Sequence, residues 1–142
     1  MEMNSAIDKT EEFIIKNDPP IYSIKGSVVH GKGIGNQMGM ATANLQCEST
    51  NLPPLGVYVA LVLWNGAQYK GVTHIGTRPT IDSDKNISIE THLLSFDGDL
   101  YGEQIEVLLL KKLREPVKFS SVEQLKEQFR CDCNEAVNFF AR

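Results

Sequence analysis

The sequence predicts a mainly β protein, built as a small antiparallel barrel with a short helix before it and a longer helix after it. Six short runs rich in β-branched and aromatic residues follow one another through the middle of the chain. No helical segment separates these runs, which excludes a parallel βαβ sheet and leaves an antiparallel barrel or sandwich, of which we prefer the barrel. A regular apolar stripe marks the last segment as helical.

A leading helix, six strands and two turn signals can be placed along the sequence. Ser5 to Lys16 is expected to form a short leading helix, because its apolar residues have loosely helical spacing and the segment ends before Asp18-Pro19-Pro20. Asn65-Gly66 is a strong hairpin signal between the third and fourth strands, whereas Asp97-Gly98 lies in a longer connection between the fifth and sixth. The predicted strands are Ile21–Val29, Ala43–Cys47, Val57–Trp64, Tyr69–His74, Ile87–Leu94 and Ile105–Leu113.

The final helix should pack against the outside of the barrel. Ser120 and Glu123 supply a capping box for its start. Cys133 is expected on the packing face as a structural thiol, not as a metal ligand. The apolar stripe consists of Val122, Leu125, Phe129, Cys133, Ala136, Val137 and Phe140.

The length and the net charge limit the number of domains and the kinds of partner. A chain of 142 residues allows one core, so we expect a leading segment and linker over residues 1–20 and one barrel domain over 21–142. The 14 Lys and Arg against 18 Asp and Glu give a net charge of -4, which argues against nucleic acid as a partner.

The cysteines and the apolar runs predict a reduced, cytoplasmic protein. Cys131 and Cys133 are too close in sequence for an unstrained mutual disulfide, and the three cysteines and three histidines lack the spacing of a zinc site. The acidic start is unlike a signal peptide, and the longest apolar run, Val57 to Trp64, is too short to span a membrane. We therefore expect neither export nor a membrane-spanning segment.

A glycine-rich segment follows the first predicted strand. Gly31, Gly33 and Gly35 would let backbone N–H groups approach phosphate oxygens, although a tight loop between two barrel strands explains the same residues. The Walker pattern fails because Gly33 stands where Ser or Thr is required, and the Rossmann pattern fails on spacing and context.

Two further groups of polar residues could carry chemistry. Thr42 and Asn44 are two residues apart, so both can face one side of a strand and offer oxygens to Mg²⁺, unless they merely cap a turn. Around Ile87–Leu93 the alternation places Glu90 and His92 on the face opposite the apolar residues. Glu90 could therefore accept a proton from a substrate hydroxyl, or it could be a solvated strand residue.

Taken together, these motifs resemble the riboflavin kinase family over about Tyr22 to Phe140. The ordered set is far more specific than any one motif. It consists of Gly26-x-Val28-Val29-His30-Gly31-x-Gly33-x-Gly35, Thr42-Ala43-Asn44, Gly76-Thr77-Arg78-Pro79, Glu90-x-His92 and Asp97-Gly98-Asp99-Leu100-Tyr101-Gly102.

The resemblance implies a six-stranded Greek-key barrel that transfers the γ-phosphoryl group of ATP to the 5′-hydroxyl of riboflavin, giving FMN and ADP. By that analogy the glycine segment covers the nucleotide phosphates, and Thr42 and Asn44 hold Mg²⁺. Glu90 would be the base, Arg114 would lie near the flavin, and Tyr101 would be a weaker contributor to nucleotide binding. In many bacterial relatives the kinase domain follows an FMN adenylyltransferase domain, for which a chain of 142 residues has no space, so we expect it to stop at FMN. We also expect a monomer.

The chain departs from the family at several positions. The family usually has an arginine where Ile34 stands, a basic residue at Gln37, a proline at Ala41 and an asparagine at His74. Losing two positive charges beside the phosphates predicts weaker nucleotide binding or weaker stabilisation of the transition state. The alternative from another class is a non-catalytic module that binds flavin or nucleotide on the same barrel.

Overall fold

The computed structural model describes residues 19–29, 41–47, 52–78, 86–96 and 98–141. The leading helix predicted over Ser5–Lys16 and the loop containing Gly31, Gly33 and Gly35 lie outside the described residues. The elements are β1 (Tyr22–Val29), β2 (Ala41–Gln46), β3 (Gly56–Trp64), β4 (Ala67–Arg78), β5 (Asn86–Leu93), β6 (Gln104–Arg114) and α3 (Val122–Ala141).

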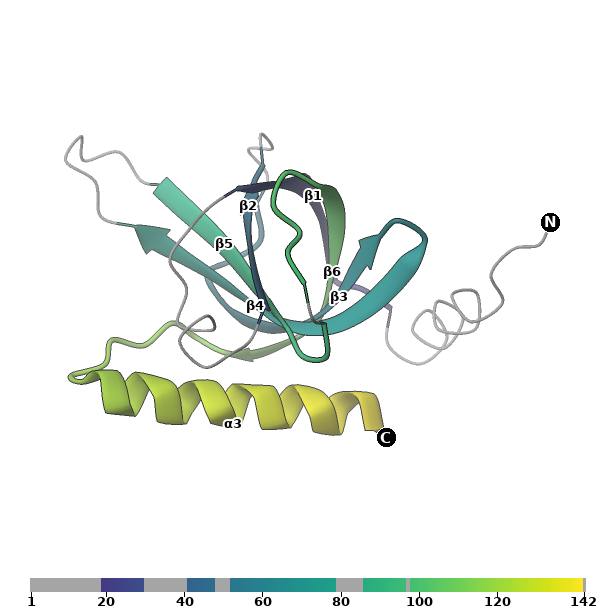
Figure 1. Ribbon diagram of the computed structural model, residues 1–142. Helices are drawn as coiled ribbons and strands as arrows, with labels where there is room; N and C mark the ends of the chain where they lie inside the picture. The colour runs from purple at the N-terminus through teal and green to yellow at the C-terminus, as the bar shows by residue number, and fades with distance from the viewer. Residues whose placement is uncertain (1–18, 30–40, 48–51, 79–85, 97, 142) are drawn as a thin grey trace.

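The six strands close into one antiparallel barrel with α3 lying across its lower side (Figure 1). Neighbours follow the order β1-β2-β5-β4-β3-β6, and β6 pairs again with β1. Because β2 lies beside β5 and not beside β3, the β3–β4–β5 meander is joined to β2 in Greek-key fashion. The predicted six-stranded antiparallel Greek-key barrel with a C-terminal helix is confirmed.

The strands lie where the sequence predicts them, with shifts at their ends. β2 begins at Ala41, earlier than predicted, because Ala41 still pairs with Leu93 on β5. β4 runs on to Arg78, which pairs with Asn86. Such extensions depend on a partner strand from elsewhere in the chain, so local composition does not reveal them.

The predicted Asn65-Gly66 hairpin joins β3 to β4. Asn65 has a φ of 53° and Gly66 a φ of 79°, and Trp64 pairs directly with Ala67 across the two-residue turn. Both central residues are left-handed, as a type I′ turn requires, and Asn and Gly accept that conformation most readily.

Alternate side chains of each strand fill the barrel. The interior includes Tyr58, Ile75, Ile89, Leu93 and Val107. A second apolar cluster lies between the outer surface of β3 and β4 and the helix, where Val57, Val59, Leu61 and Val72 meet Ala136 and Phe139 of α3. The predicted docking of the helix on the barrel exterior is therefore confirmed.

The packing face of α3 differs from the predicted stripe. Val122 and Val137 are 56% and 52% exposed, so their assignment to the packing face is wrong, while Asp132 and Phe139 are buried. The packing face is rotated slightly about the helix axis relative to the predicted stripe, because Asp132 faces the barrel and forms an ion pair with Arg114. Cys133 is half-buried in the helix–barrel cluster, as predicted.

The cap of α3 lies one residue later than the predicted Ser120–Glu123 box. The Ser121 hydroxyl accepts the Gln124 backbone N–H at 3.1 Å, which makes Ser121 the N-cap. The Gln124 side-chain oxygen accepts hydrogen bonds from the Ser120 backbone N–H and hydroxyl. Two adjacent serines offer two possible N-caps, and the helix uses the later one, with the Gln124 side chain bonded to Ser120 just before it.

Candidate functional site

One row of cross-strand partners runs around the barrel and contains most of the predicted site residues. Asn44 on β2 pairs with Glu90 on β5, and Glu90 pairs with His74 on β4. His74 in turn pairs with Val57 on β3, which pairs with Arg114 on β6. Register shifts between β3 and β6, one before Tyr58 and one after Val59, bring Arg114 opposite Val57.

The side chains of this row point out of the barrel. Their sequence neighbours Ala43, Ile75 and Ile89 belong to the interior, and side chains alternate along a strand. Val57 from the same row packs against the helix. Residues far apart in the sequence are therefore gathered on one outer surface between β2 and α3.

A cleft of about 260 Å³ opens on this surface. Glu90 contributes a carboxylate that is 20% exposed, and Arg114 contributes a guanidinium that is 17% exposed. The cleft is polar on the barrel side and apolar where the β6–α3 connection and the first turns of the helix cover it. Its lining is Gly56, Val57, His74, Ile75, Gly76, Ser88, Glu90, Arg114, Pro116, Val117, Phe119 and Leu125.

Two histidines lie beside Glu90, the buried His92 and the half-buried His74. The rings of His74 and His92 meet edge to face with centroids 5.2 Å apart, and both contact the Phe129 ring of α3. Burial lowers the pKa of His74 to about 4; Asp132 opposes this shift and Arg114 adds to it. Burial, with a smaller contribution from His74, lowers the pKa of His92 to about 3. Both imidazoles are therefore neutral at pH 7.

An ion pair fastens α3 to the edge of the cleft. Arg114 donates from Nε to Asp132 Oδ1 at 2.9 Å and from Nη2 to Oδ2 at 2.8 Å, and Gln128 also donates to Asp132. The Asp132 side chain is only 3% exposed. Arg114, predicted near the flavin, lines the cleft while it anchors the helix.

The predicted magnesium ligands lie on β2, next to Glu90. Asn44 is buried, and the Thr42 hydroxyl lies 3.1 Å from His92 Nδ1 on the neighbouring strand. Both residues offer neutral oxygens from one outer face of the strand, the kind of donor that Mg²⁺ accepts while keeping several waters. Among the described residues there is no group of three His, Cys, Asp or Glu side chains that could hold a metal ion. The oxygen donor set fits Mg²⁺ and does not resemble a transition-metal site.

Tyr101 lies apart from this cleft. Its ring is 51% exposed in the β5–β6 connection, where its backbone N–H donates to Asp99. The adjoining Gly102 N–H donates to the Val28 carbonyl near the end of β1. Tyr101 is thus placed beside the point where the chain leaves β1 for the glycine segment.

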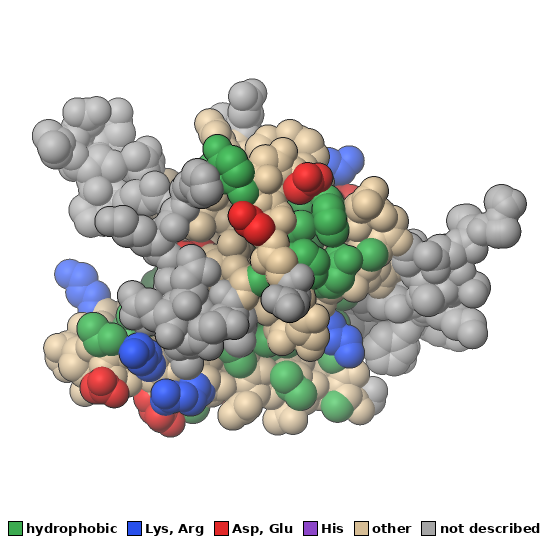
Figure 2. Space-filling view, viewed as in Figure 1, with side chains coloured by type: hydrophobic (Ala, Val, Ile, Leu, Met, Phe, Trp, Pro, Cys, Tyr) green, Lys and Arg blue, Asp and Glu red, His purple; other side chains and the backbone are tan. Residues whose placement is uncertain are grey.

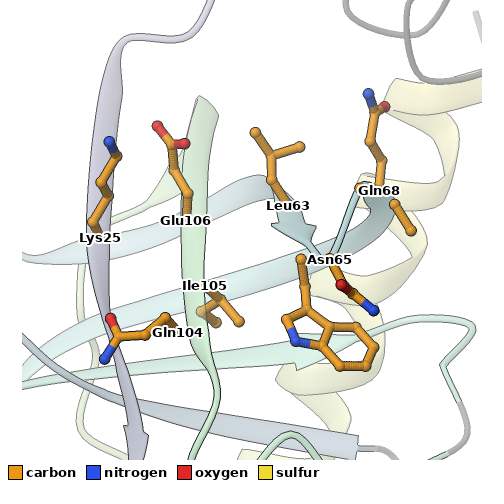
Figure 3. A pocket seen from close by; sticks show the side chains of 10 residues that line it. Lys25, Leu63, Asn65, Gln68, Gln104, Ile105 and Glu106 are labelled. Carbon is orange, nitrogen blue, oxygen red and sulfur yellow. The ribbon is translucent and has the colours of Figure 1, made fainter. Parts of the chain in front are cut away.

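A separate cavity of about 370 Å³ lies at the hairpin end of the barrel and contains none of the predicted site residues. Lys25 on β1 and Glu106 on β6 are direct cross-strand partners there, and they stand side by side in Figure 3. The opposite side of this cavity, near the hairpin, is lined by Leu63, Asn65 and Gln68 (Figure 3). Nothing in this group brings a carboxylate next to candidate metal ligands, so the cleft at Glu90 is the better candidate site.

The surface carries charges of both signs. Figure 2 shows basic and acidic side chains together along the N-terminal half of α3, where Arg130 and Glu127 form an exposed ion pair. On the barrel above, acidic and apolar side chains are interspersed in this view. In the part of the chain that the structure describes, no helix is both long and apolar enough to cross a membrane.

Sequence reasoning misses three parts of the site. It treats His74 only as a departure from the family and His92 only as a neighbour of Glu90 on the polar face, and it does not single out Asp132. The alternation of Glu90 and His92 is a usable signal, because side chains two apart on a strand share a face. Asp132, a charged residue three positions after Phe129 on a helix, is a second such signal.

The protein is thus a small Greek-key barrel with a cleft between its sheet and its C-terminal helix. Two solved structures share the fold. The crystal structure of a macrolide-efflux protein from Streptococcus pneumoniae matches 96% of this chain and 46% of its own, at 29% identity and a TM-score of 0.76. That of riboflavin kinase from Trypanosoma brucei matches 84% of this chain and 80% of its own, at 22% identity and a TM-score of 0.57, and shows the fold alone.

The family follows from the sequence match. The flavokinase model, which describes riboflavin kinase, matches residues 19–140, and the chain belongs to the riboflavin kinase family. Bifunctional riboflavin kinase/FMN adenylyltransferases from Pseudomonas fluorescens and Bacillus subtilis are 40% identical over 111 residues and 37% identical over 123. These matches cover 78% and 84% of this chain but only 36% and 39% of the two relatives.

Proposed function

We propose that this chain is a riboflavin kinase that transfers the γ-phosphoryl group of ATP to the 5′-hydroxyl of riboflavin. The observation that carries the proposal is the position of Glu90, which opens into the cleft while its cross-strand partner is Asn44. A proton acceptor and candidate ligands of a nucleotide-bound metal therefore lie on adjacent strands. Membership of the riboflavin kinase family supplies the substrate class.

The cleft can hold riboflavin in one direction. Val117, Phe119 and Leu125 offer an apolar end for the planar ring system, and Glu90 and Ser88 offer a polar end for the hydroxylated tail. Arg114 also lines the cleft and can donate to carbonyl oxygens of the ring, because its bonds to Asp132 and to the Glu115 carbonyl engage three of its five N–H groups. This orientation brings the terminal hydroxyl of the tail to Glu90.

The reaction needs positioning more than covalent catalysis. Glu90 accepts the proton of the riboflavin 5′-hydroxyl while the hydroxyl oxygen forms a bond to the γ-phosphorus of ATP. The bond between that phosphorus and the β,γ-bridging oxygen breaks, which releases ADP. Thr42 and Asn44 would hold Mg²⁺ on the phosphates, which neutralises charge there as it develops. Gly31, Gly33 and Gly35 are proposed to cover the phosphates, with Tyr101 at the edge of the nucleotide site.

The alternative is a module of the same fold that binds flavin or nucleotide without turnover. It is motivated by Ile34 and Gln37, which stand where the family usually has positive charges beside the phosphates. The proposal also includes a monomer in the cytoplasm, in keeping with the three free thiols of Cys47, Cys131 and Cys133.

The decisive experiment is incubation of the purified chain with riboflavin, ATP and MgCl₂, followed by chromatographic separation of the flavins. We expect FMN and ADP in equal amounts and no FAD, because residues 19–140 are accounted for by the kinase family alone. Riboflavin recovered unchanged from a protein that still binds it, across several nucleotides and divalent metals, would favour the non-catalytic module. Light scattering on the same sample tests the monomer.

A further inference from the structure

His92 has no exposed surface, yet it touches both halves of the proposed active site. Its Nδ1 lies 3.1 Å from the Thr42 hydroxyl, and its Nε2 lies 3.9 Å from Glu90 Oε1. Among the described residues, Nε2 has no hydrogen-bond partner. One imidazole therefore bridges the candidate metal ligand on β2 and the candidate base on β5.

The ring is held in place by its packing. Phe129 of α3 meets it edge to face with centroids 4.6 Å apart, and His74 does so from the adjacent strand. A ring so enclosed has little freedom to turn about χ2, so its two nitrogens point in fixed directions. Whatever touches those nitrogens is oriented in turn.

The surroundings favour one tautomer. A neutral imidazole carries its proton on one nitrogen and a lone pair on the other. A lone pair on Nε2 would face the Glu90 carboxylate and be repelled, whereas an Nε2–H would be attracted to it. With the proton on Nε2, Nδ1 is an acceptor, so the Thr42 hydroxyl donates to it and turns its oxygen lone pairs elsewhere.

We propose that His92 is a positioning residue that orients two groups at once: through Nδ1 it fixes the Thr42 hydroxyl as a metal ligand, and through Nε2–H it orients the Glu90 carboxylate. The inference rests on the proposed function for the roles of Thr42 and Glu90. The tautomer itself does not depend on those roles. Closing the 3.9 Å gap to Glu90 needs only a small shift of a partly exposed carboxylate.

The first test is the tautomer in the ligand-free protein, read from two-bond ¹H–¹⁵N correlations of the histidine rings. We expect His92 to carry its proton on Nε2, with the signal assigned by its loss in His92→Phe. Thr42→Val, which keeps the shape and removes the hydroxyl, should shift the Nδ1 resonance. A proton on Nδ1, or an Nδ1 signal that ignores Thr42→Val, overturns the proposal.

The second test separates the two contacts. Asn places a polar atom near the position of Nδ1, and Gln places one near Nε2, so His92→Asn should keep the Thr42 contact and His92→Gln the Glu90 contact. We expect His92→Gln to bind MgADP roughly two- to tenfold more weakly, with His92→Asn close to wild type. We expect the reverse for kcat, with His92→Asn lowered roughly tenfold and His92→Gln less affected.

His92→Phe keeps the ring packing and should lower both the MgADP affinity and kcat. The affinities for ADP without metal and for riboflavin should stay unchanged. Equal losses in the Asn and Gln variants, or losses that simply follow a falling Tm, contradict a positioning role. If riboflavin is never phosphorylated, the tautomer and the MgADP affinities still report on His92. A failed tautomer test leaves the kinase assay intact, so the two failures are distinguishable.

Discussion

Each residue of the candidate site acquires its chemistry from its place in one cross-strand row. Side chains alternate between the two faces of β5, so Glu90, next to the interior residue Ile89, points its carboxylate into the outer cleft and not into the core. Asn44 and His74 flank it because β2 and β4 are the two neighbours of β5. The proposed proton acceptor, the proposed metal ligand and the cleft proposed for the flavin are thus contiguous, although they lie far apart in the sequence.

Glu90→Gln should lower kcat by roughly 10²–10⁴, the range typical of losing a positioned general base. Gln keeps the shape and the hydrogen-bonding reach but cannot take up the hydroxyl proton at neutral pH. Riboflavin affinity and Tm should change little, because the carboxylate lies on the outer face. The measurement is kcat, riboflavin affinity and Tm on one preparation.

Glu106→Gln is the matched control for this change. Glu106 is also a strand carboxylate, but it accepts a hydrogen bond from Ser23 and lines the cavity at the other end of the barrel. Its substitution should leave turnover unchanged. Turnover near the wild-type value in Glu90→Gln would remove Glu90 from the mechanism, and a fall in Tm that precedes any kinetic loss would make it a structural residue.

Asn44→Ala should weaken MgADP binding by at least roughly tenfold, since loss of a residue behind a metal ligand typically costs 10–100-fold in affinity and loss of a ligand no less. Thr42→Ala is expected to act in the same direction. Titration calorimetry with MgADP, and with ADP in EDTA, measures the effect and its dependence on metal. Asn134→Ala, at an exposed position of α3, serves as the control. If both β2 variants bind MgADP as tightly as the wild type, Thr42 and Asn44 are not metal ligands and have only a structural role in the strand.

At the scale of the element, α3 forms one wall of the candidate site and also covers the core. Its apolar side packs on β3 and β4 through Ala136 and Phe139. About two turns before these two residues, Phe129 contacts the rings of the histidines and Asp132 forms an ion pair with Arg114 at the edge of the cleft. The position of the helix therefore determines the shape of the cleft as well as the stability of the barrel.

Asp132→Ala should destabilise the protein by about 3–5 kcal/mol, because it leaves the Arg114 guanidinium largely buried without its partner. The loosened helix should also weaken riboflavin binding. Denaturant unfolding and fluorescence titration with riboflavin measure the two effects.

The exposed pair formed by Glu127 and Arg130 on the same helix provides the comparison. Glu127→Ala should cost less than about 1 kcal/mol, as expected for a solvent-screened i,i+3 pair. Equal costs for the two variants would mean that the Arg114–Asp132 pair does not anchor α3.

At the scale of the whole molecule, the two histidines beside Glu90 couple folding to pH. The folded pKa of His74 is about 4, below the 6.5 of an exposed histidine, so the unfolded state binds more protons between these values. The free energy of unfolding should therefore fall as the pH drops below 6.5, with a contribution from His74 of about 2 kcal/mol lost by pH 5. The stability is fully present above pH 6.5.

His74→Asn, which introduces the residue usual in the family, tests this coupling. The variant should lose about 2 kcal/mol less than the wild type between pH 7.5 and pH 5 in denaturant unfolding. Asp132 raises the pKa of His74 and Arg114 lowers it, so Asp132→Ala should steepen the dependence and Arg114→Ala should flatten it. Identical pH profiles for wild type and His74→Asn would mean that His74 titrates alike in the folded and unfolded states.

The sequence by itself determined the elements and most of the candidate residues. Strand runs, the Asn65-Gly66 turn and the helical period are local patterns, and each reports on residues that are near neighbours along the chain. The alternation around Ile87–Leu93 likewise placed Glu90 and His92 on one face. The motifs and their order along the chain are enough to identify the riboflavin kinase family, because a family signature is itself a property of the linear sequence.

Only the tertiary structure decided which residues meet. The closed order β1-β2-β5-β4-β3-β6 and the register shifts before Tyr58 and after Val59 bring Asn44, Glu90 and Arg114 into one row. The side of α3 that faces the barrel includes a charge, Asp132, which is buried in an ion pair with Arg114 on β6. No local pattern contains these facts, because the energy of a buried ion pair or a cross-strand contact depends on two residues that the chain keeps far apart until it folds.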